Sequence, residues 1–211
     1  SPSFNASGPE KKAEKKSGET IEGTIVALGD SLTEGLGVEE EFAYPALLEQ
    51  KLQKQGYQYR VINAGISGET SSGTLSRIKW LLTLKPDIVI LVIGANDGFR
   101  GIETDLIESN IRAIIRQLHD NNVTVVLGGL QIVQNLGREY TSAFSEIYPE
   151  VARTEDVILM PFFLDGVGAE PGLNQPDGIH PTAAGYQVIV DNLMPYVLEA
   201  IQVHRQKGEK S

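Results

Sequence analysis

The stretch from Thr24 to Thr33 reads TIVALGDSLT, a short apolar run followed by a small polar turn. A run this short and rich in β-branched residues does not support a helix but suits a strand buried on both faces. The turn Gly29-Asp30-Ser31 then presents a hydroxyl group directly after the run. The sequence therefore predicts a strand over residues 24–28 whose carboxyl end opens into a polar loop.

The same pattern recurs along the chain. Further β-branched runs predict strands at residues 59–62, 87–93, 123–127 and 157–160. Helical periodicities between and after them predict helices at residues 44–55, 74–84, 106–121, 141–153 and 182–206. Strands that alternate with helix-length crossovers are typical of a parallel sheet covered by helices on both faces, so we expect an α/β fold.

Two residues in the predicted helices lead to specific expectations. Pro195 lies inside the last predicted helix, where it removes a backbone hydrogen bond, so a kink or break is expected there. Trp80 accompanies Leu81 and Leu84 in the second predicted helix, and we expect it to pack in the core.

Composition limits the classes of partner and chemistry. A chain of 211 residues suits one domain, and the absence of cysteine excludes thiolate catalysis and cysteine-ligated metals. The net charge of −10 repels phosphate backbones, so nucleic acid is not an expected partner. The longest apolar stretch, Ile88 to Ile93, is far shorter than the roughly 18 residues that a transmembrane segment needs, so none is expected.

The ends of the chain differ from the body. Residues 1–20 are polar and rich in lysine, with Phe4 as their one large apolar side chain, which predicts a flexible N-terminal tether. The domain is expected to cover residues 21–206, and residues 207–211 are expected to form a disordered tail. Such a tether favours an exported, periplasmic or lipid-anchored bacterial protein over a cytoplasmic one.

The loops after the strands contain the polar residues of interest. Ligands of open parallel sheets bind beyond the carboxyl ends of the strands, near the point where strand order reverses. If the strand order is 2-1-3-4-5, which we assume, Ser31 lies between the loops that carry Gly68 and Asn96. Taken alone, a serine in such a turn is more often a helix cap, and an asparagine in a glycine-rich loop is by default a turn residue.

A further loop combines Asp177 with His180. A carboxylate three residues before an imidazole can accept the Nδ1 proton, which leaves Nε2 free as a base. With a serine hydroxyl within reach, this pair completes a nucleophilic constellation. By itself the pair could also be a capping arrangement or a pair of metal ligands.

Four motifs together resemble the four blocks of the SGNH (GDSL) hydrolase superfamily, in the same order. They are Gly29-Asp30-Ser31-Leu32, Ile66-Ser67-Gly68-Glu69-Thr70, Gly94-Ala95-Asn96-Asp97 and Asp177-Gly178-Ile179-His180-Pro181. The segments Asn96 to Gly101 and Pro161 to Phe163 are similar to the bacterial branch of multifunctional acyl-CoA thioesterases, arylesterases and lysophospholipases. The resemblance covers about residues 22–200.

This resemblance implies a flavodoxin-like, three-layer α/β/α sandwich with a five-stranded parallel sheet and hydrolysis of small-molecule acyl esters or thioesters. It implies that Ser31 is the nucleophile, His180 the general base and Asp177 the residue that orients His180. The implied oxyanion hole consists of the backbone N–H groups of Ser31 and Gly68 and the side-chain amide of Asn96. No cofactor or metal is implied.

Substrate contacts are expected from Asp30 and Ala95 and from the segment after the fourth strand, where Ile132, Val133 and Leu136 could line an acyl site. Ala95 occupies a position where this branch often has glycine, so we expect this residue to bear on the chain-length preference. The other interpretation of Ile132 and Val133 is that they extend the fourth strand into the core.

Two alternative functions stay open. A carbohydrate O-acetyl esterase could use the same triad, and a doubly wound fold could be a nucleotide- or flavin-binding module. The second alternative is disfavoured because the chain has no P-loop motif and Gly35-Leu36-Gly37 lacks the third glycine of a dinucleotide fingerprint. A metal hydrolase is also disfavoured, because the three histidines are dispersed along the chain.

Overall fold

The computed structural model describes residues 20–132 and 136–211. The expected tether therefore lies, except for Thr20, outside the described residues, and so does Val133. Within the described residues, no helix combines the length and the apolar character that a membrane crossing requires.

A parallel sheet of five strands in the order β2-β1-β3-β4-β5 forms the centre of the described structure. The strands are β1 (Gly23–Gly29), β2 (Tyr59–Gly65), β3 (Ile88–Val92), β4 (Thr124–Gly128) and β5 (Ile158–Met160). This confirms both the predicted α/β class and the assumed strand order. All residues of β3 and β4 are buried, which explains why they are apolar without alternation.

The register of the sheet brings three strand ends to one level. Gly29 at the end of β1 pairs with Gly65 at the end of β2 and with Val92 at the end of β3. The loops that follow these residues start side by side, although they are far apart in the sequence. One edge of the sheet therefore carries Ser31, Gly68 and Asn96.

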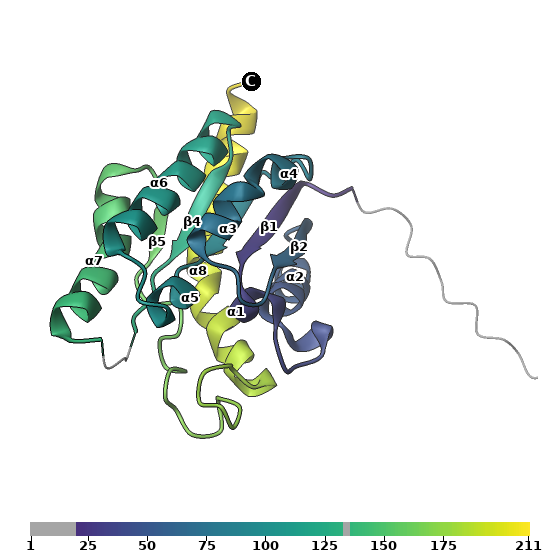
Figure 1. The fold of residues 1–211 in the computed structure, drawn as a ribbon. Coiled ribbons are helices and arrows are strands. Elements are labelled where there is room, and N and C mark those ends of the chain that lie inside the picture. The colour runs from purple at the N-terminus through teal and green to yellow at the C-terminus, as the bar shows by residue number, and fades with distance from the viewer. Residues whose placement is uncertain (1–19, 133–135) are drawn as a thin grey trace, which may run out of the picture.

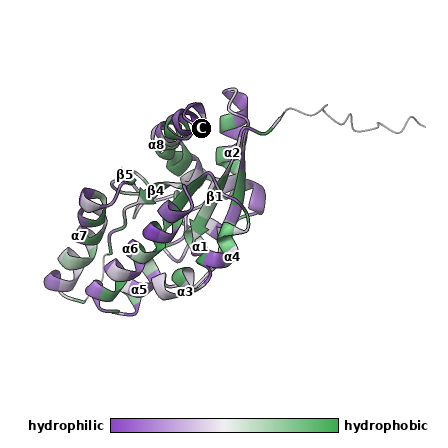
Figure 2. Cartoon of the chain, turned by 90° about the horizontal axis from the view of Figure 1, so that it is seen from above, coloured by the Kyte–Doolittle hydropathy of each residue, from purple (hydrophilic) through white to green (hydrophobic). Residues whose placement is uncertain are grey.

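Helices cover both faces of the sheet in a three-layer sandwich (Figures 1 and 2). Helices α2 (Tyr44–Lys54) and α8 (Ala183–Glu209) contact each other on one face. On the other face, α6 (Thr104–Asp120) contacts both α3 (Ser71–Ser76) and α7 (Arg138–Thr154). Figure 2 shows the apolar strands between these two helical layers.

Short helices directly follow two strands and were not predicted. Helix α1 (Ser31–Glu34) begins after β1, and α5 (Ala95–Phe99) begins after β3. A short 3₁₀ turn, η1 (Glu40–Phe42), precedes α2. Such elements are too short to show the 3.6-residue periodicity on which a helix prediction rests.

The second predicted helix is divided in two. Helix α3 ends at Ser76 and α4 (Ile78–Leu82) begins after Arg77, whose φ of −109° and ψ of 6° interrupt the helical path. In α4 the buried residues are Ile78 and Leu81, one turn apart, so Trp80 faces outward and is 56% exposed. The expectation that Trp80 packs in the core is therefore wrong.

The last helix differs from expectation at two places. Helix α8 runs without a break through Pro195, so of the expected kink or break the break is wrong, and the kink stays a prediction. Buried residues on both sides, including Met194 and Val197, hold the helix against the sheet and offset the lost hydrogen bond. The helix also continues to Glu209, so a disordered tail over residues 207–211 is wrong for residues 207–209.

Candidate active site

Ser31 is the first residue of α1 and lies just beyond the carboxyl end of β1. Asp30 caps this helix, because its Oδ1 accepts the Leu32 N–H at 3.0 Å. The turn requires glycine at position 29, where a Cβ atom would lie 2.4 Å from the Val92 carbonyl oxygen. The tight strand-to-helix turn thus fixes the backbone that presents the Ser31 hydroxyl.

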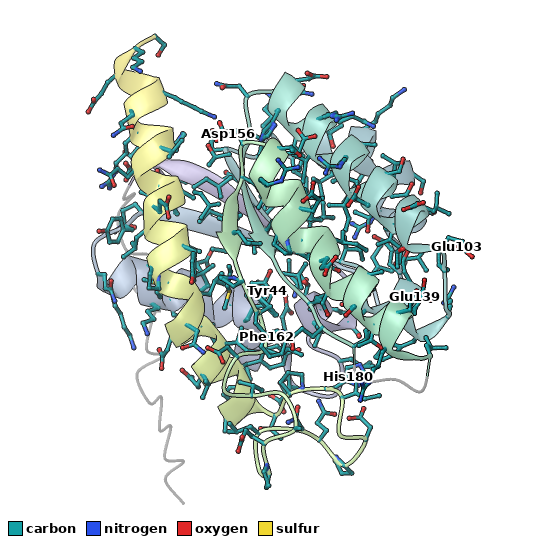
Figure 3. All side chains as sticks on the ribbon, turned by 90° about the vertical axis from the view of Figure 1, so that its left-hand side faces the viewer. Tyr44, Glu103, Glu139, Asp156, Phe162 and His180 are labelled. Atoms are coloured by element: carbon teal, nitrogen blue, oxygen red, sulfur yellow. The ribbon has the colours of Figure 1, made fainter. Side chains whose placement is uncertain are left out.

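The Ser31 hydroxyl lies 3.0 Å from His180 Nε2, although 149 positions separate the two residues. On the opposite side of the ring, His180 Nδ1 lies 2.5 Å from Asp177 Oδ2. An ionised carboxylate only accepts hydrogen bonds, so Nδ1 carries the proton and Nε2 accepts from Ser31. In Figure 3, His180 lies at the end of the sheet opposite Asp156, which precedes the start of β5.

Asp177 also organises its own loop. Its Oδ1 accepts the backbone N–H groups of Ile179 at 2.9 Å and His180 at 3.0 Å. The hydrogen bond from the His180 ring, followed by these two backbone bonds, holds the pKa of the Asp177 carboxyl well below its usual range. The carboxylate therefore stays ionised and keeps the imidazole in the tautomer described above.

Gln175 anchors this loop, although no sequence motif pointed to it. Its Nε2 donates to the carbonyl oxygens of Leu36 at 2.8 Å and Pro181 at 2.9 Å, and its backbone N–H donates to His180 O at 2.7 Å. These bonds tie the histidine loop to the segment after α1. No local pattern around Gln175 indicates this role, because its partner Leu36 is 139 positions away.

Asn96 and Gly68 lie on the two loops that flank Ser31. The Asn96 side-chain amide donates to the Glu69 carbonyl oxygen at 3.0 Å and approaches Asp30 Oδ2 at 3.4 Å. Gly68 has a φ of +80°, and a Cβ atom there would meet nothing within 4 Å. Backbone conformation rather than crowding therefore requires glycine at this position.

A buried polar contact joins the same two loops beneath the surface. The carboxylate of Asp97, next to Asn96, accepts both the backbone N–H and the hydroxyl of Ser71, at 2.8 and 2.6 Å. The Asn110 amide donates in turn to the Ser71 hydroxyl at 3.0 Å. The beginning of α3 and the beginning of α5 are thus held in one arrangement.

A cavity of about 230 Å³ opens beside Ser31 and His180. Its wall includes Ala95, Ile132 and further apolar side chains: Leu32, Phe99 and Ile179 from the quoted motifs, and Leu130 and Leu164 from outside them. Ile132 is buried beyond the end of β4, so it lines the cavity and does not extend the strand. Leu136 does not line this cavity and is 43% exposed, and Val133 is not described.

Asp30 also contributes to the cavity wall, but it is almost fully buried. Burial raises the pKa of its carboxyl group to about 6, against an ordinary value of 3.8. Because its oxygens face the Leu32 N–H and the Asn96 amide, we interpret Asp30 as a residue that supports the site and not as a substrate contact.

Residues 27–188 match the model of the GDSL-like lipase/acylhydrolase family, and this range contains Ser31, Gly68, Asn96, Asp177 and His180. The chain belongs to this family. Family membership makes the chain an acyl hydrolase, as the four sequence motifs predicted. Within the described residues, no group of three or more histidine and acidic side chains is placed to hold a metal ion.

Relatives within the family span most of the chain. Esterase TesA of Pseudomonas aeruginosa is 40% identical over 173 residues, which cover 82% of this chain and 86% of that protein. Thioesterase 1/protease 1/lysophospholipase L1 of Escherichia coli K12 is 39% identical over 169 residues, 80% of each chain.

A solved structure agrees in fold. The psychrotrophic esterase EstA from Pseudoalteromonas sp., solved in a form inhibited by monoethylphosphonate, superposes with a TM-score of 0.81 at 30% identity. The match covers 85% of this chain and 99% of EstA.

Proposed function

We propose that this protein is a serine hydrolase that cleaves acyl esters and thioesters, with Ser31 as nucleophile, His180 as general base and Asp177 as the residue that orients His180. The chain of hydrogen bonds from Ser31 through His180 to Asp177 carries this proposal. The names of the relatives, which include an esterase and a thioesterase/lysophospholipase, support the choice of substrates.

In the proposed reaction, Ser31 Oγ attacks the acyl carbonyl carbon while His180 Nε2 takes the hydroxyl proton. The tetrahedral intermediate then collapses, and His180 returns this proton to the departing alcohol or thiol. A water molecule attacks the acyl-serine, again losing a proton to His180, and the acid is released as Ser31 regains its proton. Asp177 stabilises the imidazolium that forms in each half-reaction.

The negative charge of the intermediate needs donors that are already in place. In this proposal the backbone N–H groups of Ser31 and Gly68 and the Asn96 side-chain amide point to the former carbonyl oxygen. Such donors contribute about 10²- to 10³-fold each to the rate, because they need no reorganisation during the reaction. The hydrogen bond from Asn96 to Glu69 O supports this role, since it limits the rotation of the amide.

The cavity favours an acyl chain longer than acetyl. Its volume of about 230 Å³ is several times the roughly 30 Å³ that one water molecule occupies in the liquid. Large apolar side chains form most of its wall and would release water on binding a hydrocarbon chain. The apolar wall suits a hydrocarbon acyl chain better than the polar carbohydrate of an O-acetyl esterase substrate, and family membership favours a hydrolase over a nucleotide- or flavin-binding module.

The test is hydrolysis of p-nitrophenyl esters graded from acetyl to lauroyl, together with the matching acyl-CoA thioesters. We expect kcat/KM to rise when the acyl chain is lengthened beyond acetyl. Ser31→Ala should abolish turnover of every substrate while circular dichroism stays unchanged, and Ser145→Ala on α7 serves as the matched control. Near-normal turnover in Ser31→Ala rejects the nucleophile, and a preference for acetyl rejects the acyl-chain assignment.

A further inference from the structure

Arg77 and Glu69 form an ion pair behind the proposed oxyanion hole. Arg77 Nε lies 2.8 and 3.0 Å from the two carboxylate oxygens of Glu69, and the Thr74 hydroxyl donates to Glu69 Oε1 at 2.6 Å. The side chains of Arg77 and Glu69 are only 14% and 8% exposed, respectively. This pair is therefore largely withdrawn from solvent, unlike an ordinary surface ion pair.

The same guanidinium also reaches the ends of two strands. Its NH2 group donates to the carbonyl oxygen of Ala64 at 2.7 Å and to that of Gly29 at 3.3 Å. Gly29 ends β1 two residues before Ser31, and Ala64 is the last residue but one of β2, four residues before Gly68. Arg77 thus connects β1, β2 and the loop that follows β2.

Each proposed oxyanion donor is linked to this guanidinium through few covalent or hydrogen bonds. Gly68 is the covalent neighbour of Glu69, whose side chain Arg77 holds. Asn96 donates to the backbone carbonyl of that same Glu69. Ser31 follows Gly29 by two residues, and Arg77 contacts the Gly29 carbonyl oxygen.

We propose that Arg77 is a positioning residue that fixes the three oxyanion donors relative to one another by binding Gly29, Ala64 and Glu69 at the same time. The proposal rests on the oxyanion hole of the proposed function. This role is consistent with the break between α3 and α4. Arg77 lies at the junction of these two helices, and from there its side chain contacts Glu69 in the loop after β2.

Arginine suits this task because its planar guanidinium presents donors in fixed directions. A lysine keeps the positive charge but offers one flexible ammonium group, which cannot satisfy the carboxylate and two separate carbonyls in the same geometry. Arg77→Lys therefore separates geometry from charge, and Arg77→Gln removes both.

The matched control is Arg112 on α6, which belongs to another partly buried ion pair. Its side chain is 17% exposed, and its partner Glu155 is 12% exposed. Arg112→Lys should lower the stability of the protein to a similar extent and leave the loops of the site unchanged. Thermal unfolding of all variants measures this loss of stability separately from the change in kinetics.

For the kinetic test, kcat and KM are measured on a p-nitrophenyl acyl ester. We expect Arg77→Lys to lower kcat by about 10²-fold with KM changed less than kcat, because displaced donors fail mainly in the transition state. Arg112→Lys should leave both constants near those of the wild type. A normal kcat in both Arg77 variants overturns the proposal.

A double-mutant cycle with Asn96→Ala distinguishes positioning from a general loss of stability. If Arg77 acts through the oxyanion donors, Arg77→Lys should cost much less in the Asn96→Ala background than in the wild type. A fully additive pair of losses overturns the proposal, because it shows that Arg77 does not act through this donor.

A measurement that does not depend on catalysis, NMR of the amide groups, tests this proposal separately from the proposed function. We expect the NMR signals of the Gly68 backbone amide and the Asn96 side-chain amide to shift in Arg77→Lys and to stay in place in Arg112→Lys. If these signals shift while the wild type hydrolyses no ester, the proposed function fails, and what stands is that Arg77 positions these two amide groups. If they stay in place in Arg77→Lys, the positioning role fails even for an active esterase.

Discussion

The side-chain amide of Asn96 donates to the backbone carbonyl of Glu69 at 3.0 Å, which joins the loop after β3 to the loop after β2. One amide hydrogen is engaged in this contact, and the amide also approaches Asp30 Oδ2 at 3.4 Å. The first contact orients the amide before any substrate binds. The second N–H faces Asp30 Oδ2 at a long distance, and in the proposed reaction it leaves this contact to donate to the developing negative charge.

Asn96→Ala should therefore lower kcat on a p-nitrophenyl ester by about 10²-fold and change KM little, because the lost contact is made mainly in the transition state. Steady-state kinetics checks this split. Asn121→Ala, at an exposed position at the C-terminal end of α6, is the control. An effect on KM alone identifies Asn96 as a ground-state binding residue instead.

Asp177→Asn should lower kcat by roughly 10³- to 10⁴-fold, because an amide can hold His180 in the wrong tautomer. The measurement is kcat at a pH where the wild type is fully active. Asp156→Asn, at the opposite end of the sheet, is the control and should leave kcat unchanged. Comparable losses in both variants contradict an orienting role for Asp177.

The pH profile follows from the same pair. The His180 hydrogen bond and two backbone N–H groups depress the pKa of Asp177, so this carboxylate remains ionised while the medium is acidified through the ordinary carboxyl range. Activity should fall at acidic pH, since a protonated His180 ring cannot accept the serine proton. Asp30, whose carboxyl has a pKa raised to about 6, also takes up a proton beside the Asn96 amide, so the pH profile of kcat/KM is measured in Asp30→Asn as well as in the wild type. We expect the loss of activity in acid to persist in Asp30→Asn, and a rate that does not depend on pH contradicts the role of His180 as a base.

Asp30→Asn should stabilise the protein at neutral pH. Burial raises the folded-state pKa of Asp30 to about 6 from an ordinary 3.8, so between these values the folded state binds more protons than the unfolded state. Stability contributed by this group is therefore present below its ordinary pKa and declines as pH rises toward 6. The decline amounts to roughly 3 kcal/mol at most.

Urea unfolding at pH 7 and at acidic pH checks this prediction. We expect the free energy of unfolding of Asp30→Asn to exceed that of the wild type at pH 7, with a smaller difference in acid. Asp120→Asn, at an exposed carboxylate on α6, should show no such pH-dependent difference. An Asp30→Asn variant less stable than the wild type at pH 7 refutes the expected sign.

Gly94→Ala should destabilise the loop that carries Asn96. Gly94 has a φ of +126°, and a Cβ atom there would lie 2.3 Å from the Tyr148 hydroxyl oxygen, which donates to Ile93 O. Gly56→Ala is the matched control, because Gly56 also has a positive φ of +86° but open space around it. We expect the free energy of unfolding, measured in urea, to fall by about 1 kcal/mol in the control and by roughly 1–3 kcal/mol more in Gly94→Ala. Equal losses would falsify the steric argument.

Local sequence patterns predicted the α/β class, the five strands and the loops in which the candidate site residues lie. These features were predictable because a strand or a long helix depends on residues that are neighbours in the chain. The pair Asp177 and His180 was predictable for the same reason, since three positions separate the two side chains. The short helices α1 and α5 lacked enough residues to show a period.

The residues that support the site from distant parts of the chain were not predictable from the sequence and were found in the folded protein. Arg77 has no local signal, because its partners Gly29 and Ala64 reach it through the parallel pairing of β1 and β2. The same is true of Gln175, which meets Leu36 only after the histidine loop packs against the segment after α1. Packing also placed Ile132 in the cavity wall, because contact between segments far apart in the chain depends on the whole fold and not on local preference.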